Sequence, residues 1–239
     1  MCARLTTTLW LLASLLLPTH AQSEAFTPRG MLDFNLYPYQ SDVDTDSVFT
    51  LNTASTLPGR LSYFGFINLA GQNDGTDTTG YYAEQSLYWK TGASYGLDLT
   101  AQAAFASGED NDKLRLGVRW RAHDTGFSRA LFEYLHLNYT LNLHFVQFDH
   151  SSAYVWQLEH AFYLRMPYLS ERLYLGGFMD HTFNEDLPTG FPSNPVVAEA
   201  QLGYRLWDRL YLVGEYRINQ YRRSDVNNFA AGLEYKITF

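Results

Sequence analysis

The feature that most constrains this chain is a strict alternation of apolar with polar or small residues, repeated in segment after segment. In residues 229–239 one face carries only apolar side chains, and the other carries polar or small ones. Residues 210–219 and 196–206 repeat this pattern, and none of the three has the spacing of an amphipathic helix. Side chains of a strand point alternately to opposite faces. Each segment is therefore predicted to be a β-strand with one apolar and one polar face.

The same alternation continues upstream and predicts the architecture. It is clear in residues 32–37, 97–105, 113–121 and 135–144, and weaker in 46–56, 60–70 and 80–92, which are placed partly by their spacing. Short turns are predicted at 57–59, 91–94, 123–126, 167–171 and 207–209, and longer polar loops at 40–46, 71–80, 107–112, 184–194 and 222–227. Short turns that alternate with long loops are typical of a barrel with two different ends. The prediction is an all-β fold, an antiparallel up-and-down β-barrel of about twelve strands.

Alternation alone does not separate a soluble barrel or sandwich, which is apolar inside, from a transmembrane barrel, which is apolar outside. Composition favours the membrane barrel. Aromatic residues make up 16% of the 239 residues and charged residues only 18%, against about 25% charged in an average soluble domain. Rings near the predicted strand ends would form two interfacial girdles. These rings are Tyr37, Tyr39, Tyr81, Tyr82, Trp89, Trp120, Tyr154, Trp156, Tyr168 and Trp207.

The first residues have the order of a secretory signal peptide. Arg4 precedes an apolar run at 9–17, Pro18 breaks the run, and Ala21 ends a segment suited to cleavage. A transmembrane anchor would need about 20 apolar residues, roughly twice this run. Residues 1–21 are therefore predicted to be a cleaved signal peptide, and residues 22–239 the barrel domain. No later stretch is apolar over about 18 residues, so no spanning helix is predicted.

Charge and the last residue indicate the partners. The net charge of -8 argues against a nucleic-acid polymer as partner, because such a protein needs a basic face to neutralise phosphates. Phe239 closes the last predicted strand and resembles the outer-membrane signal that the barrel assembly machinery reads. The predicted partners are outer-membrane lipid, a small polar solute and that machinery. The predicted location is the outer membrane of a Gram-negative bacterium.

Five segments carry a resemblance to a known family. They are residues 31–37, 63–68, 82–89, 213–216 and 231–235. In their layout the chain resembles the Tsx-like nucleoside-specific channel-forming outer-membrane proteins, which are twelve-stranded barrels, although its loops are shorter. The resemblance covers nearly the whole chain after the leader. It implies a channel for passive uptake of small hydrophilic solutes, with nucleosides as the candidate solute, and no ligand residues are carried over.

Polar residues on the inward face are the candidate functional residues. Those predicted to line the lumen are Asp33, Asn35, Tyr37, Glu84, Asp98, Arg115, Arg119, Tyr134, His136, Asn138, Glu199, Glu215, Arg217 and Glu234. Arg115 and Arg119, together with Lys113 and Arg121, would form a basic stripe along one strand, facing carboxylates on other strands. Opposed walls of charge would orient a dipolar solute. The alternative is that these charges only pair across adjacent strands to satisfy a polar interior.

Aromatic residues are also predicted inside the barrel. They are Tyr37, Phe132, Tyr134, Tyr174, Phe178 and Tyr211. Such rings could stack on a flat solute such as a nucleobase, at about 1–3 kcal/mol per base, or they could simply fill a narrow lumen. Both interpretations remain open on the sequence alone.

No metal or cofactor is predicted, and an enzyme is the weaker alternative. His136 and His144 would lie on one face of a strand, but about 27 Å apart at 3.4 Å per residue, too far to share an ion. His150 and Ser152 have the spacing of an outer-membrane lipid hydrolase or deacylase, with Glu159 further on. The asparagine and glycine that follow the serine in those enzymes are absent, which favours a polar loop tip. A non-conducting structural barrel is the other alternative to the channel.

Overall fold

The computed structural model describes residues 27–40, 47–71, 78–92, 94–108, 111–149 and 154–239. The predicted leader, residues 1–21, and the candidate pair His150 and Ser152 lie outside these ranges, so what was predicted for them stays a prediction. The described residues form twelve strands. They are β1 (Gly30–Pro38), β2 (Ser47–Leu57), β3 (Leu61–Gly71), β4 (Thr78–Lys90), β5 (Leu97–Ala106), β6 (Lys113–Arg121), β7 (Leu137–Phe148), β8 (Trp156–Arg165), β9 (Leu173–Phe183), β10 (Val196–Arg205), β11 (Leu210–Asn219) and β12 (Asn227–Thr238).

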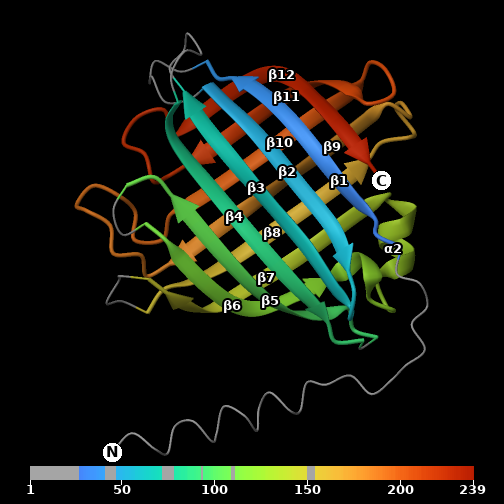
Figure 1. The fold of residues 1–239 in the computed structure, drawn as a ribbon, viewed down its shortest axis with the longest axis horizontal. Helices are drawn as coiled ribbons and strands as arrows, with labels where there is room; N and C mark the ends of the chain where they lie inside the picture. Colours follow the sequence, from blue (N-terminus) through green and yellow to red (C-terminus); the bar gives the residue numbers. More distant parts are fainter. Residues whose placement is uncertain (1–26, 41–46, 72–77, 93, 109–110, 150–153) are drawn as a thin grey trace, which may run out of the picture.

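The strands close into a single barrel (Figure 1). Each strand pairs antiparallel with its neighbours in sequence, and β1 pairs with β12 to complete the ring. At the seam, Gly30 and Phe239 exchange backbone hydrogen bonds of 2.9 and 3.1 Å. A closed ring has no sheet edge, so no strand is left with unpaired backbone groups. A strand that crosses lipid requires this, because lipid offers no hydrogen-bond partners. The predicted antiparallel up-and-down barrel of twelve strands is confirmed.

The two ends of the barrel differ. At one end, called here the short-turn end, brief turns join β2 to β3, β4 to β5, β8 to β9 and β10 to β11. The fifth connection at this end is longer and contains a 3-10 turn, η2 (Ala122–Asp124), and a helix, α2 (Arg129–Tyr134). Figure 1 shows α2 at the end of the barrel where the C-terminus lies. The connections at the opposite end, called the long-loop end, include the segment between β9 and β10.

The prediction of a short turn at residues 123–126 and a strand from Leu135 is therefore wrong. β7 begins only at Leu137, after His136 in a left-handed backbone conformation with φ of 52°. The reason is packing against the outer wall of the barrel. The ring of Phe127 stacks on Trp120, and the ring of Phe132 stacks on Tyr139. These ring contacts tie the connection to the outward residues Trp120 and Tyr139, which a tight turn would not reach.

His123 helps to fix this connection to the wall. Its Nδ1 lies 3.0 Å from the carbonyl oxygen and 3.2 Å from the backbone nitrogen of Tyr139. Burial lowers the pKa of His123, with the nearby Arg121 acting in the same direction. A lowered pKa keeps the imidazole neutral, and its tautomer decides whether Nδ1 donates to the Tyr139 carbonyl oxygen or accepts from the Tyr139 nitrogen.

The barrel is polar inside and apolar outside. Directly paired residues share a face, so the register places Asp98 beside Arg119 and Leu99 beside Val118. Asp98 is 0% exposed and points inward, while Leu99 is exposed on the outer wall. The buried residues are mostly polar or charged, and the exposed large hydrophobic residues lie largely on outward positions of the strands. A soluble barrel has the reverse distribution.

Aromatic rings gather near the ends of the outer wall, with some corrections to the predicted girdles. Exposed rings include Tyr81, Trp89, Tyr154, Tyr168 and Trp207, and Trp120 and Trp156 are partly exposed. Three of the predicted girdle rings, Tyr37, Tyr39 and Tyr82, point inward instead. They fall on the same face as the buried carboxylates of their own strands, because alternation along the strand decides the direction of each side chain. Among the described residues, no helix is long and apolar enough to cross a membrane.

Candidate functional site in the barrel interior

Most of the predicted lining residues fall on inward positions of strands. They are Asp33, Asn35, Tyr37, Glu84, Asp98, Arg115, Arg119, Asn138, Glu199, Glu215, Arg217 and Glu234. Tyr134 and His136 do not. Tyr134 ends α2 and is 69% exposed, and His136 precedes β7. The prediction that these two, and Phe132, belong to the lumen-facing side of a strand is wrong, because the chain between β6 and β7 folds as a helix on the outer wall.

The charges at several inward positions pair across adjacent strands. Asp98 accepts bonds from Arg119, with Nε at 2.9 Å and an Nη at 2.5 Å, and from Arg121, with Nε at 3.0 Å. Arg217 donates to Glu199 at 2.6 Å. For these groups the structure favours pairing that satisfies a polar interior over an uncompensated transverse field. Two guanidinium groups share one fully buried carboxylate, so Asp98 is held from two sides.

A second set of bonds includes one, from Gln102 to Glu159, that crosses the interior between strands that are not neighbours. Gln102 of β5 donates through Nε2 to Glu84 at 3.1 Å and to Glu159 of β8 at 3.4 Å. Arg115 donates to the Gln102 carbonyl oxygen at 2.7 Å. Asn142 donates to Glu159 at 2.5 Å, and His144 lies 3.3 Å from the same carboxylate. Glu84, Gln102, Arg115, Asn142, His144 and Glu159 are called the central network below.

A tyrosine network fills the other half of the interior. Tyr37 donates to Gln201, whose amide donates to the hydroxyl of Tyr174. Tyr174 in turn donates to Glu234 at 2.6 Å, and the Lys236 ammonium lies 4.0 Å from the centre of the Tyr174 ring. A cation over an aromatic face is attracted to the ring. The tyrosine network is Tyr37, Tyr174, Gln201, Glu234 and Lys236.

Glycine makes room for this network. A Cβ at Gly203 would lie 2.0 Å from the ring of Tyr174, so only glycine allows the ring to lie against the wall. Phe178 and Tyr211 also occupy inward positions. The members of both networks that point to the barrel axis, such as His144 at 1% exposed, are almost entirely covered by other side chains. The middle of the lumen is therefore filled by polar side chains and tyrosine rings.

A cavity of about 520 Å³ opens above the central network, toward the long-loop end. Glu84 and Arg115 line it, so it reaches the central network. Asp180, Glu199 and Arg217 contribute charge to its wall. This cavity is called the vestibule below. Its lining also includes the aromatic residues Phe66, Tyr81, Tyr82, Phe178 and Tyr221.

Tyr221 lies just beyond the end of β11, at the outer part of the vestibule. Burial raises the pKa of Tyr221 to about 12, and the Glu185 carboxylate acts in the same direction. Its hydroxyl therefore stays protonated near neutral pH and can donate a hydrogen bond.

Several buried polar atoms inside the barrel have no hydrogen-bond partner among the described residues. They include Asp33 Oδ1, both amide atoms of Asn35, His144 Nδ1, Gln157 Nε2 and Asp180 Oδ1. Buried polar groups are usually satisfied. A water molecule beside each of these atoms would complete the hydrogen bonding of the interior.

Sequence reasoning overlooked several residues of the interior. Gln102 and Asp180 were not identified as lining residues, and Glu159 was considered only as part of a hydrolase. Alternation along each strand carries the missing signal, since Asp180 has the same parity as Phe178, and Gln102 the same parity as Asp98. No group of three or more His, Cys, Asp or Glu residues suited to a metal ion occurs in the described part of the chain.

A closed antiparallel barrel with a polar interior and an apolar outer wall defines the class: this is a transmembrane β-barrel of the outer-membrane type. Comparison with protein-family models gives no match. Comparison with curated proteins gives no match either.

Solved structures of similar shape are known. A structure of "KdgM porin" is 12% identical, covers 87% of this chain and 98% of that chain, and has a TM-score of 0.49. A "KdgM porin in complex with disordered oligogalacturonate" is 11% identical, with coverages of 87% and 98% and a TM-score of 0.48. OccK11 (OpdR) of Pseudomonas aeruginosa is 10% identical, with coverages of 91% and 68% and a TM-score of 0.36. The class of this chain rests on its own strand pairing and side-chain distribution.

Proposed function

We propose that this chain is a channel in the outer membrane of a Gram-negative bacterium that passively admits small hydrophilic solutes. The observation that carries the proposal is the nature of the lumen filling. Among the described residues, the middle is occupied by hydrogen-bonded polar side chains, such as Gln102 and Arg115, and not by an apolar plug or an inserted segment of backbone. A solute can exchange hydrogen bonds with such groups one after another. Conduction requires this kind of binding, spread over several weak sites.

The width of the barrel limits the solute. Twelve strands enclose a lumen wider than that of an eight-stranded barrel, which side chains fill, and narrower than that of a 16-stranded porin. The vestibule of about 520 Å³ is large enough for one small solute. We therefore expect transport to depend steeply on solute size.

Nucleosides are the proposed solute. Phe178 and Tyr82 line the vestibule and offer aromatic faces, and the neighbouring Asp180 offers a carboxylate with an unpartnered oxygen. A ring for stacking beside an acceptor for a sugar hydroxyl or an exocyclic amine matches the chemistry of a nucleoside. The Tsx-like resemblance of the sequence favours the same solute.

Swelling of liposomes that contain the purified protein tests the function. We expect swelling in adenosine to be several-fold faster than in a trisaccharide, because the central network restricts large solutes. Phe178→Ala is expected to slow swelling in adenosine while leaving a pentose unchanged, because only the base stacks. If no solute causes swelling above that of protein-free liposomes, the channel is contradicted. If adenosine enters no faster than a disaccharide of similar mass, the channel stands and the nucleoside proposal fails.

The burial of the central network favours one second candidate, a non-conducting structural barrel. The absence of swelling with correctly folded protein would support it. We do not propose an enzyme: Glu159, the third group of the hydrolase hypothesis, is bound inside the barrel by Asn142 and His144. Recognition of Phe239 by the barrel assembly machinery stays a prediction.

A further inference from the structure

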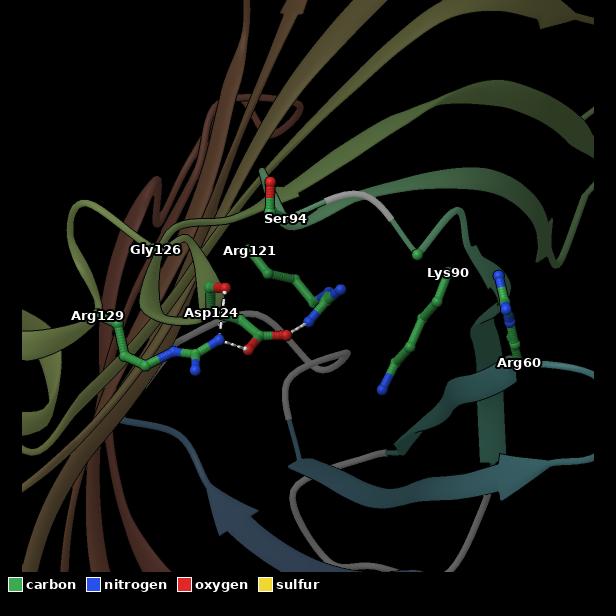
Figure 2. Close-up of a pocket in the computed structure, with 8 residues that line it drawn as sticks. Arg60, Lys90, Ser94, Arg121, Asp124, Gly126 and Arg129 are labelled. Atoms are coloured by element: carbon green, nitrogen blue, oxygen red, sulfur yellow. Dashed lines mark hydrogen bonds and ion pairs between the residues drawn. The ribbon is translucent and has the colours of Figure 1, made fainter.

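A second cavity, of about 570 Å³, lies at the short-turn end of the barrel. Its lining residues come from three separate connections and the strand ends beside them (Figure 2). Arg60 belongs to the turn between β2 and β3, Lys90 ends β4, Arg121 ends β6, and Arg129 begins α2. Asp124 of η2 is the one acidic residue among them. This cavity is called the basic mouth below.

The basic mouth has an excess of positive charge. Four basic side chains line it against one carboxylate. Asp124 is engaged by Arg121 and by Arg129, the latter at 2.9 Å. Among the described residues, neither Arg60 nor Lys90 has an ion pair. Unlike the paired charges in the middle of the lumen, these two cations are available to a ligand.

The geometry already accommodates an anionic group. The Asp124 carboxylate sits between two guanidinium groups that come from different elements, β6 and the start of α2. Figure 2 shows Lys90 and Arg121 reaching toward the same space from opposite sides, with Arg60 beside Lys90 on the side away from Arg121. An oxyanion in this space would meet cations on two walls. Arginine binds carboxylate and phosphate through two parallel hydrogen bonds.

The arrangement is held in place by the rest of the fold. Arg121 is anchored by the fully buried Asp98, with Nε at 3.0 Å. The connection that carries Asp124 and Arg129 is fixed by the stacking of Phe127 on Trp120 and by a 2.7 Å bond from the Trp120 indole to Thr125. A ligand site whose groups are already positioned loses less entropy on binding. Because the connection between β6 and β7 is longer than the other turns at this end, it brings a second guanidinium group, that of Arg129, to the basic mouth.

We propose that the basic mouth binds a compact solute with two negative charges on oxygen, a phosphate monoester or a dicarboxylate, at the short-turn end of the lumen. Divalent anions are favoured over monovalent ones because four cations line the cavity, whereas the carboxylates that offset them are Asp124 in the lining and Asp98 behind Arg121. Lys90 and Arg121 are at the inward positions of their strands, so the ligand is a solute in the lumen and not a lipid headgroup on the outer wall.

Calorimetric titration of the purified full-length protein in detergent tests the proposal, with inorganic phosphate at pH 8, succinate and acetate as probes. The titration is done at about 10 mM ionic strength, where the Debye length is about 30 Å. We expect saturable binding of phosphate and succinate, and weaker binding of acetate. The double variant Arg60→Gln/Lys90→Gln is expected to bind phosphate at least about tenfold more weakly, because charge-assisted hydrogen bonds are lost.

The matched control is Arg205→Gln/Arg209→Gln. It removes the same charge at the same end, but around β10 and β11, on the far side of the ring from β4. We expect its phosphate affinity to be unchanged, and both double variants to retain the heat-modifiable gel mobility of a folded barrel. An equal loss of phosphate affinity in the two double variants would show only a general charge effect and would overturn the proposal. The absence of saturable phosphate binding by the wild type would also overturn it. Loss of phosphate binding in phosphatidylglycerol nanodiscs, but not in phosphatidylcholine nanodiscs, would assign the site to lipid and overturn it too.

Discussion

Replacement of Asp98 by alanine is expected to lower the free energy of unfolding by about 3–5 kcal/mol, the cost of leaving a buried charge without its partner. Asp98 is 0% exposed and holds both Arg119 and Arg121. Without it, two guanidinium groups inside the barrel lose their shared carboxylate. Urea unfolding in detergent, followed by tryptophan fluorescence and by heat-modifiable gel mobility, measures the change.

Asp124→Ala is the matched control for this prediction. Asp124 contacts the same Arg121, but its side chain is 41% exposed. An exposed ion pair contributes about 0–1 kcal/mol, so the control is expected to change the free energy of unfolding by no more than that. If the two variants are equally destabilised, the buried pairing of Asp98 is not what stabilises this wall.

Leu116→Arg is expected to destabilise the barrel in lipid by about 2–4 kcal/mol, the cost of a charged residue on the lipid face near the bilayer midplane. Leu116 lies near the centre of β6 on the outer wall and is 39% exposed. In a soluble protein, a similarly exposed leucine could be replaced by arginine with an effect within about 0.5 kcal/mol. The sign and size of the change in the free energy of unfolding therefore indicate whether lipid or water surrounds the outer wall of the barrel. Equilibrium unfolding from phospholipid vesicles is the measurement.

Leu169→Arg serves as its control. Leu169 is 77% exposed in the turn between β8 and β9, beyond the ends of the strands. There an arginine can reach water, so we expect a change below about 1 kcal/mol. Equal and small effects of both substitutions would contradict a lipid-facing outer wall.

The fold could be predicted from the sequence because its main determinant is local. Alternation within a strand, as in Phe229, Leu233 and Tyr235, decides which side chains share a face, and it needs no knowledge of the other strands. The helical connection could not be predicted in the same way. Phe127 stacks on Trp120 and Phe132 stacks on Tyr139, and these contacts exist only once the barrel wall has formed.

The interior was less predictable than the wall. Inward directions follow from alternation, but contacts across the lumen depend on how the ring closes. Gln102 and Glu159 are 57 residues apart and meet only because the closed ring directs the inward side chains of β5 and β8 into the same lumen. The basic mouth depends even more on closure, since Arg60, Lys90 and Arg129 come from three connections. Charge type can be read from the sequence, whereas the pairing of charges cannot.

The central claim is that small polar solutes and ions pass through a polar constriction in the barrel. Single-channel recording in planar bilayers tests this claim most directly. We predict small, discrete conductance steps for the wild type. We predict larger steps for Gln102→Ser, because the amide that joins Glu84 to Glu159 across the interior is removed. If folded wild-type protein and Gln102→Ser both insert and neither gives any conductance step, the channel is contradicted and a structural barrel is supported.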